Sequence, residues 1–344
     1  MRDVRIGAVN WDCSLPPDTY FGYYQTRSLS PQKFRTVTPF YADVLGDNSI
    51  TYHYRTQEEF DTELRFALDA GIDYFAYVWY GEEGSRNCEP KGPNSCSHKV
   101  YELTYARKMH LKSALREKLH LCAIAGAHPF TENDIRELVL AMREPFYEKI
   151  DGKPLLYVFN GRRMDFIEAV RKMCAALQVT EPFVVPLMTG MIDPVEDCSG
   201  VDALSAYTCE KSGIDTYKEL SDTVIAENES RRQTGMPVIP LYSTGWDPSP
   251  RVEHPCPWYG YPNVQYTKFA SEEELLEGAD ALVSWIREKA AAQFAGHILS
   301  FAWNEFEEGG IICPVMNERC ETDISRLKAF RKVSDYFKNN LKTL

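Results

Sequence analysis

The sequence has no long uninterrupted apolar run, and it is short of positive charge. No window approaches the ~18 apolar residues of a membrane-spanning helix, although 44% of the 344 residues are hydrophobic. Lysine and arginine number 38 against 50 aspartates and glutamates, which gives a formal net charge of −12. Because a protein needs a positive surface to bind a phosphate backbone, we expect neither nucleic acid nor a membrane as a partner.

The opening segment, MRDVRIGAVNWD, lacks the basic-then-apolar layout of a secretory signal. We therefore expect a cytoplasmic protein, or a periplasmic or secreted one if the chain is a trimmed mature form. The ten cysteines are scattered and too sparse for a disulfide scaffold. Cys88 and Cys96 bracket a loop that could close as a disulfide or, with His98, hold a metal. No Cys-x-x-Cys pair completes a tetrahedral set, so we expect no metal.

Several common cofactor and nucleophile motifs are also missing. The chain has no Gly-x-Gly-x-x-Gly turn, no P-loop and no Gly-x-Ser-x-Gly elbow. These absences disfavour a dinucleotide enzyme, a nucleotide hydrolase and a serine hydrolase. We expect no cofactor.

Short apolar runs alternate with longer amphipathic stretches along the whole chain, which is typical of a parallel sheet. Eight strands are predicted, each followed by a helix: Val4–Asn10, Asp73–Tyr80, Leu119–Gly126, Pro154–Phe159, Phe183–Leu187, Ala203–Tyr207, Val238–Tyr242 and His297–Trp303. This pattern favours a single-domain α/β fold over residues 1–344, a (β/α)8 TIM barrel, over an open six-stranded Rossmann sheet.

The helices carry their own boundary signals. Thr56–Glu59 and Ser271–Glu274 fit the capping box at a helix start, and the glycines Gly71 and Gly296 suit the helix ends. Further helices are predicted over Tyr101–Lys118, Glu132–Tyr147, Met164–Leu177, Thr216–Arg232 and Asp323–Leu341.

Three long connections follow predicted strands: Trp11–Arg55, Gly81–Val100 and Ser243–Ala270. In a barrel these segments lie at the C-terminal face, where active sites are built, so we expect long loops there.

Polar and aromatic residues gather at the predicted strand ends. A barrel end rich in aromatic rings, amides and carboxylates suits a sugar as ligand. The C–H faces of a sugar pack on aromatic rings, and its hydroxyl groups need hydrogen-bond partners. These residues could instead have structural roles. The rings could close the top of the barrel, and His128 could be a buried histidine whose ring nitrogens are hydrogen-bonded within the protein. Asp12 could cap a turn, and Asp247 could pair with Arg251 to stabilise a loop. The candidate substrate-binding residues are Asn10, Trp11, Asp12, Trp79, Tyr80, His128, Asn160, Tyr207, Trp246, Asp247, Arg251, Trp303 and Asn304.

Glu305, Glu307 and Glu308 follow the last predicted strand. A single helical turn would place Glu305 and Glu308 on one face with Cβ atoms roughly 5–6 Å apart, near the roughly 5–5.5 Å carboxyl separation of retaining glycosidases. Two such close carboxylates should differ in pKa, one serving as acid and the other as base. The following Gly309–Gly310 pair would let the backbone approach a substrate. The alternative is a solvated acidic loop.

The segment from Asn304 to Gly309, Asn-Glu-Phe-Glu-Glu-Gly, resembles the corresponding motif of glycoside hydrolase family 99, the endo-acting α-mannosidases and α-mannanases. It also resembles the related WbsX-type proteins of bacterial polysaccharide clusters. GIDYFAYVWY (Gly71–Tyr80) and GWDPSPR (Gly245–Arg251) are supporting matches, so the resemblance spans most of the chain.

The resemblance implies a retaining hydrolase that uses the 2-hydroxyl of its substrate as the nucleophile, through a 1,2-anhydro sugar. Glu305 would then deprotonate that hydroxyl, while Glu308 would protonate the leaving oxygen and later activate water. The chain departs from the family at Glu307, where the mannan-cleaving enzymes typically have histidine. A third carboxylate there would change the local charge and the contacts with the sugar.

The sequence therefore predicts a glycosidase acting on an α-linked, mannoside-like oligosaccharide or polysaccharide, with Glu305 and Glu308 as the catalytic pair and a bell-shaped pH profile. One alternative is a glycosyltransferase-like protein of polysaccharide assembly, although no diphosphate site is evident. The other is a non-catalytic glycan-binding barrel.

Overall fold

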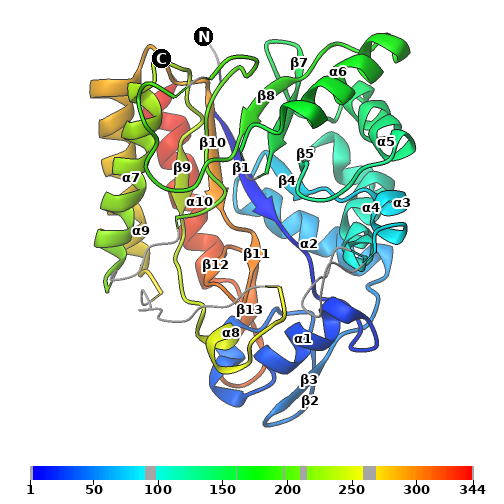
Figure 1. Ribbon diagram of the computed structural model, residues 1–344. Coiled ribbons are helices and arrows are strands. Elements are labelled where there is room, and N and C mark those ends of the chain that lie inside the picture. The colour runs from blue at the N-terminus through cyan, green and yellow to red at the C-terminus, as the bar shows by residue number, and fades with distance from the viewer. Residues whose placement is uncertain are drawn as a thin grey trace.

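The structure is a computed structural model that describes residues 3–89, 98–159, 161–196, 198–209, 215–258 and 269–342. Its centre is a parallel sheet with helices on its outer side (Figure 1). Along the sheet the strands run in the order β8-β7-β5-β4-β1-β10-β9. These strands are β1 (Arg5–Asn10), β4 (Tyr74–Val78), β5 (His120–Ala125), β7 (Lys153–Val158), β8 (Phe183–Pro186), β9 (Leu241–Ser243) and β10 (His297–Phe301).

Two isolated bridges close the sheet into a ring. Leu187 pairs with Ser205, and Leu204 pairs with Val238, a few residues before β9. Residues 204 and 205 therefore occupy the sixth position of the barrel, although they pair too briefly to form the predicted strand Ala203–Tyr207. The other seven predicted strands overlap observed ones. The predicted (β/α)8 fold is confirmed.

Each of the seven predicted helix segments contains a barrel helix. The capping boxes at Thr56–Glu59 and Ser271–Glu274 are both formed. Gly71 directly follows the end of its helix, with a left-handed φ of 78°, as predicted. Gly296 does not end a helix, because the helix before it stops at Trp285 and a π turn continues only to Ala290. The helices are α2 (Gln57–Asp69), α4 (Tyr105–Lys112), α5 (Glu132–Arg143), α6 (Met164–Leu177), α7 (Tyr217–Gln233), α9 (Glu272–Trp285) and α10 (Ser325–Leu341).

Two helix predictions need correction. No helix follows β8 within residues 188–196 and 198–203, where Pro194 and the left-handed Gly190 and Gly200 oppose helical geometry. The helix predicted over Tyr101–Lys118 is confined to α4 because Ser113 is extended, with ψ 142°. Short 3-10 or π turns complete the described chain at Gln32–Val37, Val100–Thr104, Ala114–Glu117 and Ile286–Ala290.

Inside the barrel, side chains from neighbouring strands fill the space tightly. A Cβ atom on Gly7 of β1 would lie 2.1 Å from the Tyr74 ring, so only glycine leaves room for that ring. The Tyr74 hydroxyl in turn meets the Tyr157 hydroxyl at 2.9 Å. The barrel interior is therefore a packed core rather than a channel.

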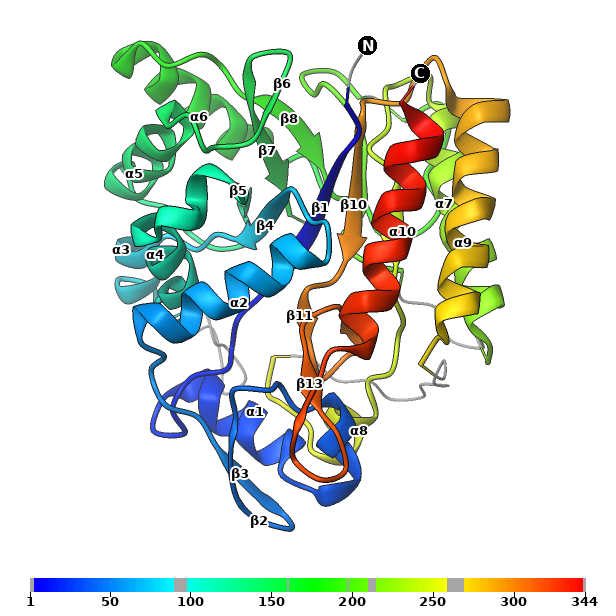
Figure 2. The ribbon, with the colours of Figure 1, turned by 180° about the vertical axis from the view of Figure 1, so that it is seen from behind.

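The connections at the C-terminal ends of the strands form a cap. It contains α1 (Tyr20–Leu29), α3 (Glu82–Arg86), α8 (Ser249–Glu253) and short hairpins made by β2 (Asp43–Gly46) with β3 (Ser49–Thr51), β11 (Asn304–Glu305) with β12 (Gly310–Ile311), and β13 (Val315–Met316) with β14 (Thr322–Asp323). Figure 1 shows α1, α8 and the β2–β3 hairpin at the lower end, with β11 and β12 between them and the barrel strands, whereas both termini lie at the upper end; Figure 2 shows the same arrangement from behind. The long loops after β1 and β9 thus lie where they were predicted.

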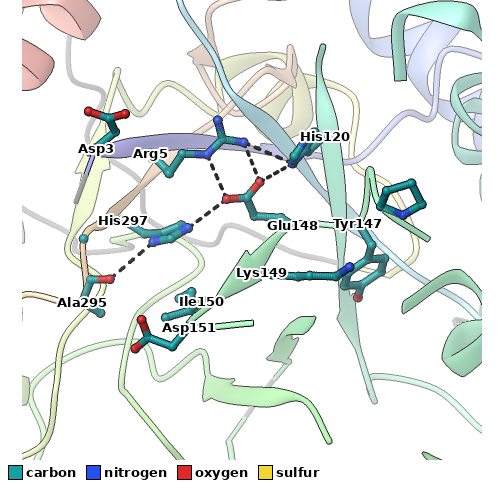
Figure 3. Close-up of a pocket in the computed structure, with 12 residues that line it drawn as sticks. Asp3, Arg5, His120, Tyr147, Glu148, Lys149, Ile150, Asp151, Ala295 and His297 are labelled. Atoms are coloured by element: carbon teal, nitrogen blue, oxygen red, sulfur yellow. Dashed lines mark hydrogen bonds and ion pairs between the residues drawn. The ribbon is translucent and has the colours of Figure 1, made fainter. Parts of the chain in front are cut away.

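The opposite, N-terminal end of the barrel holds a charged cluster around Glu148, just before the short strand β6 (Lys149–Ile150). Figure 3 shows Arg5, His120 and His297 turned toward this carboxylate. Arg5 Nη2 donates at 2.6 Å, and the ring nitrogens of His120 and His297 lie at 2.8 and 3.0 Å. Although burial raises the pKa of Glu148, these hydrogen bonds hold it well below its usual range.

The cluster lines a cavity of about 340 Å³. Because its central carboxylate is already saturated with donors, and because active sites of this fold lie at the other end, the cluster is a stabilising brace. None of the helices in the described ranges is both long and apolar enough to cross a membrane.

Candidate active site

The acidic motif forms a hairpin rather than the predicted helical turn. β11 pairs with β12 through Asn304–Ile311 and Glu305–Gly310, and the Glu308 amide donates to the Glu305 carbonyl at 3.0 Å. This tight turn still places both glutamates on the wall of one cavity. Gly309 has φ 79°, and a Cβ atom there would lie 2.4 Å from the Asp247 amide nitrogen. The glycine thus serves the contact between two loops, not the predicted approach to a substrate.

The cavity has a volume of about 470 Å³ and lies at the C-terminal end of the barrel. Its lining combines carboxylates and a guanidinium with several aromatic rings. The structure brings together seven of the predicted site residues on this wall: Trp11, Tyr80, His128, Tyr207, Arg251, Glu305 and Glu308.

Glu305 is buried, with 3% of its surface exposed. The Tyr207 hydroxyl donates to its Oε1 at 2.5 Å, while Oε2 has no hydrogen-bond partner among the described residues. Burial and then the nearby charge of Glu308 raise the pKa of Glu305 well above its ordinary value, and Arg251 and Tyr207 offset this only in part. The surroundings of Glu305 therefore favour the protonated form of its carboxyl group.

Glu308 has a different environment. Arg251, from α8, donates through Nη1 to Glu308 Oε1 and through Nη2, at 3.4 Å, to Glu307 Oε2. The guanidinium also lies over the Trp11 ring, 5.2 Å from its centroid. A permanent positive charge therefore stands against Glu308, whereas Glu305 has only a neutral donor beside it.

Glu307 does not reach the cavity, contrary to the expectation that it changes contacts with the sugar. It is 1% exposed. The Ser28 hydroxyl donates to its Oε1, and the Cys13 thiol lies 3.8 Å from its Oε2. Glu307 therefore acts on the site through its negative charge and through its contact with Arg251.

Two predicted binding residues brace the site from behind. Asn304 Oδ1 accepts from the Trp11 amide at 2.9 Å, and its Nδ2 donates to Asn10 Oδ1 at 3.1 Å. Neither asparagine lines the cavity. The pair ties β1 to the hairpin and so fixes Trp11 relative to Glu305.

Asp12 and Trp303 belong to a second buried ion cluster and not to the cavity wall. Arg55 donates to both Asp12 and Glu63, and the Trp303 indole donates to Glu63 Oε1 at 2.7 Å. Burial raises the pKa of Glu63 to about 7. The cluster links α2 to the segments that follow β1 and β10.

The last predicted binding residues also lie outside the cavity wall. The Arg107 guanidinium covers the Trp79 ring, 3.9 Å from its centroid, and Trp246 packs on Phe301. Asp247 accepts from the Ser249 amide at 3.0 Å at the start of α8. Two further residues, Asn160 and Cys96, fall outside the described residues, so the role of the first and the pairing of the second with Cys88 stay predictions.

The prediction missed one aromatic wall. The Trp258 ring lies 4.9 Å from Phe21 and 5.3 Å from Tyr24, centroid to centroid. Trp258 and Phe21 come from the long loops after β9 and β1, which were expected to build the site, although nothing periodic in those loops distinguishes the lining residues. The cavity residues that were not predicted are Phe21, Val78, Val100, Phe159, Thr189 and Trp258.

Within the described part of the chain, no group of three or more histidine, cysteine, aspartate or glutamate side chains could hold a metal ion.

No family model and no curated protein sequence matches the chain. Solved structures do. A glycoside hydrolase-like protein superposes with a TM-score of 0.62 at 15% identity, covering 98% of this chain and 94% of its own. A family 99 endo-α-mannosidase from Bacteroides thetaiotaomicron, in complex with Bis-Tris propane, gives 0.61 at 13% identity, covering 100% and 99%. A second structure of that enzyme gives 0.57 at 11% identity, covering 99% of each chain. The chain therefore has the (β/α)8 fold of the family 99 endo-α-mannosidases, over its whole length.

Proposed function

We propose that this chain is a retaining glycoside hydrolase that cleaves an α-linked, mannoside-like glycan, with Glu305 and Glu308 as its catalytic pair. The observation that carries the proposal is the unequal setting of these two carboxylates on one cavity wall: Glu305 is buried beside Tyr207, and Glu308 is paired with Arg251. Unequal carboxylates at one site are what glycosidic bond cleavage requires. The fold shared with endo-α-mannosidases supports the choice of substrate class.

In the proposed reaction the 2-hydroxyl oxygen of the sugar attacks its own anomeric carbon and gives its proton to Glu305. The bond to the leaving oxygen breaks, and that oxygen takes a proton from Glu308. Water then opens the 1,2-anhydro ring: Glu308 takes a proton from the water, and Glu305 returns a proton to the 2-oxygen. Protons and charges balance over the two steps, and the anomeric configuration is retained.

The proposed reaction starts with Glu305 ionised and Glu308 protonated. A pair of coupled carboxyl groups titrates as one unit, so a proton that moves between Glu305 and Glu308 changes no net charge. The leaving oxygen, by approaching Glu308, would compete with Arg251 for that carboxyl group.

The remaining lining residues suit a sugar chain. A cavity of about 470 Å³ falls within the range of small-molecule sites, roughly 300–1,000 Å³. Trp11, Phe21 and Trp258 offer faces for sugar C–H groups, while His128 and Thr189 can exchange hydrogen bonds with hydroxyls.

The test is a product screen on defined α-linked oligosaccharides with the anomer followed by NMR. We expect hydrolysis with retention, and a loss of about 10²- to 10⁴-fold in kcat for Glu305→Gln and for Glu308→Gln. Glu318→Gln, an exposed glutamate in the loop between β13 and β14, is the matched control and should act as wild type. Binding of glycans without any cleavage would instead identify a non-catalytic glycan-binding barrel, and cleavage undiminished in both variants would refute the catalytic assignment.

A further inference from the structure

We infer that Glu307 is a positioning residue, which holds the Arg251 guanidinium between two carboxylates and so sets the charge balance of the catalytic pair. The inference rests on the proposed function, because it concerns the same two glutamates. It gives a role to a buried carboxylate that touches neither the cavity nor a substrate.

The contacts form one continuous chain. Ser28, on α1, donates to Glu307 Oε1, and Glu307 Oε2 accepts from Arg251 Nη2 at 3.4 Å. Arg251 then donates through Nη1 to Glu308, which lines the cavity. All four side chains are buried. A guanidinium has donors in a fixed planar fork, so a contact at one nitrogen orients the other.

Charge balance gives this chain of contacts a consequence. Three carboxylates of one hairpin lie around a single guanidinium, so one carboxylate must remain without a cationic partner, and Glu305 is that one. Glu307 partly neutralises the positive charge of Arg251. The surroundings of Glu305 and Glu308 are therefore more negative than they would be with a neutral residue at position 307. Negative charge nearby favours the protonated form of a carboxyl group, and Glu307 is among the groups that raise the pKa of Glu305.

Among the described residues, the groups that interact with Glu307 are Arg251 from α8, Ser28 from α1, Glu305 from its own hairpin, Cys13 from the loop after β1, and Tyr52 from the cap. Two further charged groups, Asp12 and Arg35, lie near Cys13 and Tyr52. Of the two arginines, Arg35 is bound to the carbonyls of Gly46 and Asp47, which leaves Arg251 as the cation that links Glu307 to the pair.

The test compares Glu307→Gln, which keeps the size but removes the charge, with Glu307→Asp, which keeps the charge. In Glu307→Gln both limbs of the pH profile of kcat/KM should move to lower pH by about one unit, because a nearby negative charge is lost. KM should stay within about twofold, since Glu307 does not touch the cavity. Glu307→Asp should lower kcat while leaving the limbs in place. Glu307→Asn replaces the glutamine variant if that variant does not fold.

A second readout does not depend on any substrate. The infrared band of a protonated carboxyl group, assigned to Glu305 by its loss in Glu305→Gln, should titrate at lower pH in Glu307→Gln than in wild type. An unmoved band, or lower activity with an unmoved pH profile, would show that Glu307 has only a packing role. If the wild type cleaves no glycan but the band still shifts in Glu307→Gln, the inference about Glu307 stands and only the proposal of a hydrolase is rejected.

Discussion

The Tyr207 hydroxyl donates to Glu305 Oε1 at 2.5 Å, from a segment of the chain 98 residues away. It is the one hydrogen bond described for that carboxyl group, since Oε2 has no partner among the described residues. Tyr207 therefore stabilises the ionised form of Glu305 against the effect of burial. The proposed reaction needs that ionised form in its first step.

Replacing Tyr207 tests this relationship. In Tyr207→Phe we expect the pKa of Glu305 to rise further, because a donor to its carboxylate is lost, and the acidic limb of the profile to move to higher pH. The loss in kcat/KM should be roughly 10- to 100-fold, as for a hydrogen bond to a charged group. Tyr157→Phe, which removes a hydroxyl in the barrel interior, should change thermal stability and leave the pH profile unmoved. An equal shift in both variants would contradict the assignment.

The dependence on leaving group decides which glutamate is the acid. If Glu308 protonates the leaving oxygen, Glu308→Gln should lose about 10²- to 10⁴-fold on glycans but far less on substrates with activated leaving groups, which need no proton. Glu305→Gln should be impaired on both. Steady-state rates on a natural-type disaccharide and on the matching glycosyl fluoride measure the difference. The reverse pattern would assign the acid to Glu305, whose pKa is raised by burial and by the charge of Glu308.

The aromatic wall should affect binding more than chemistry. In Trp258→Ala we expect KM to rise about tenfold with kcat nearly unchanged, because the indole ring offers a face to the sugar and carries no group that takes part in the proposed proton transfers. Trp285→Phe is a suitable control, since that ring lies on α9 and hydrogen-bonds to Glu229. If KM stays constant in Trp258→Ala while kcat falls, Trp258 supports the reacting groups and not the glycan.

The cluster at the other end of the barrel should govern stability and not activity. Glu148→Gln leaves Arg5 and two histidines without their buried carboxylate, and breaking such a cluster costs about 3–5 kcal/mol. Because the pKa of Glu148 is lowered in the folded state, its contribution is present above the unfolded value and disappears as the pH falls through the folded one. The gap in Tm between wild type and variant should thus be widest near neutrality and should narrow below about pH 4.5. A gap that does not change with pH would exclude this ionic origin.

The sequence could predict which end of the barrel carries the site but not which side chains face the cavity. Trp11 and Trp303 both stand at strand ends, yet Trp11 lines the cavity while Trp303 turns back to Glu63. The direction of each ring is set by partners that are distant in the chain. Trp258 could not be identified for the same reason: its place depends on rings of α1, more than 230 residues earlier.

The acidic motif shows the same limit on a smaller scale. Spacing alone predicted that Glu305 and Glu308 lie side by side, and a hairpin turn achieves this as well as a helical one would. Spacing could not show that Glu307 turns away, because that depends on Ser28 and Arg251, which approach it from two separate loops.

The barrel wall is not uniform around its circumference. At the sixth position two single bridges, Leu187 with Ser205 and Leu204 with Val238, stand in place of a strand, although residues 202–205 still hydrogen-bond to the segments on both sides. No helix covers the described residues between β8 and that position. We therefore expect the amide protons there to exchange faster than those of β1 and β4, which pair over four residues. Tyr207 lies two residues beyond Ser205, so its hydrogen bond to Glu305 depends on a part of the barrel wall that is paired only briefly.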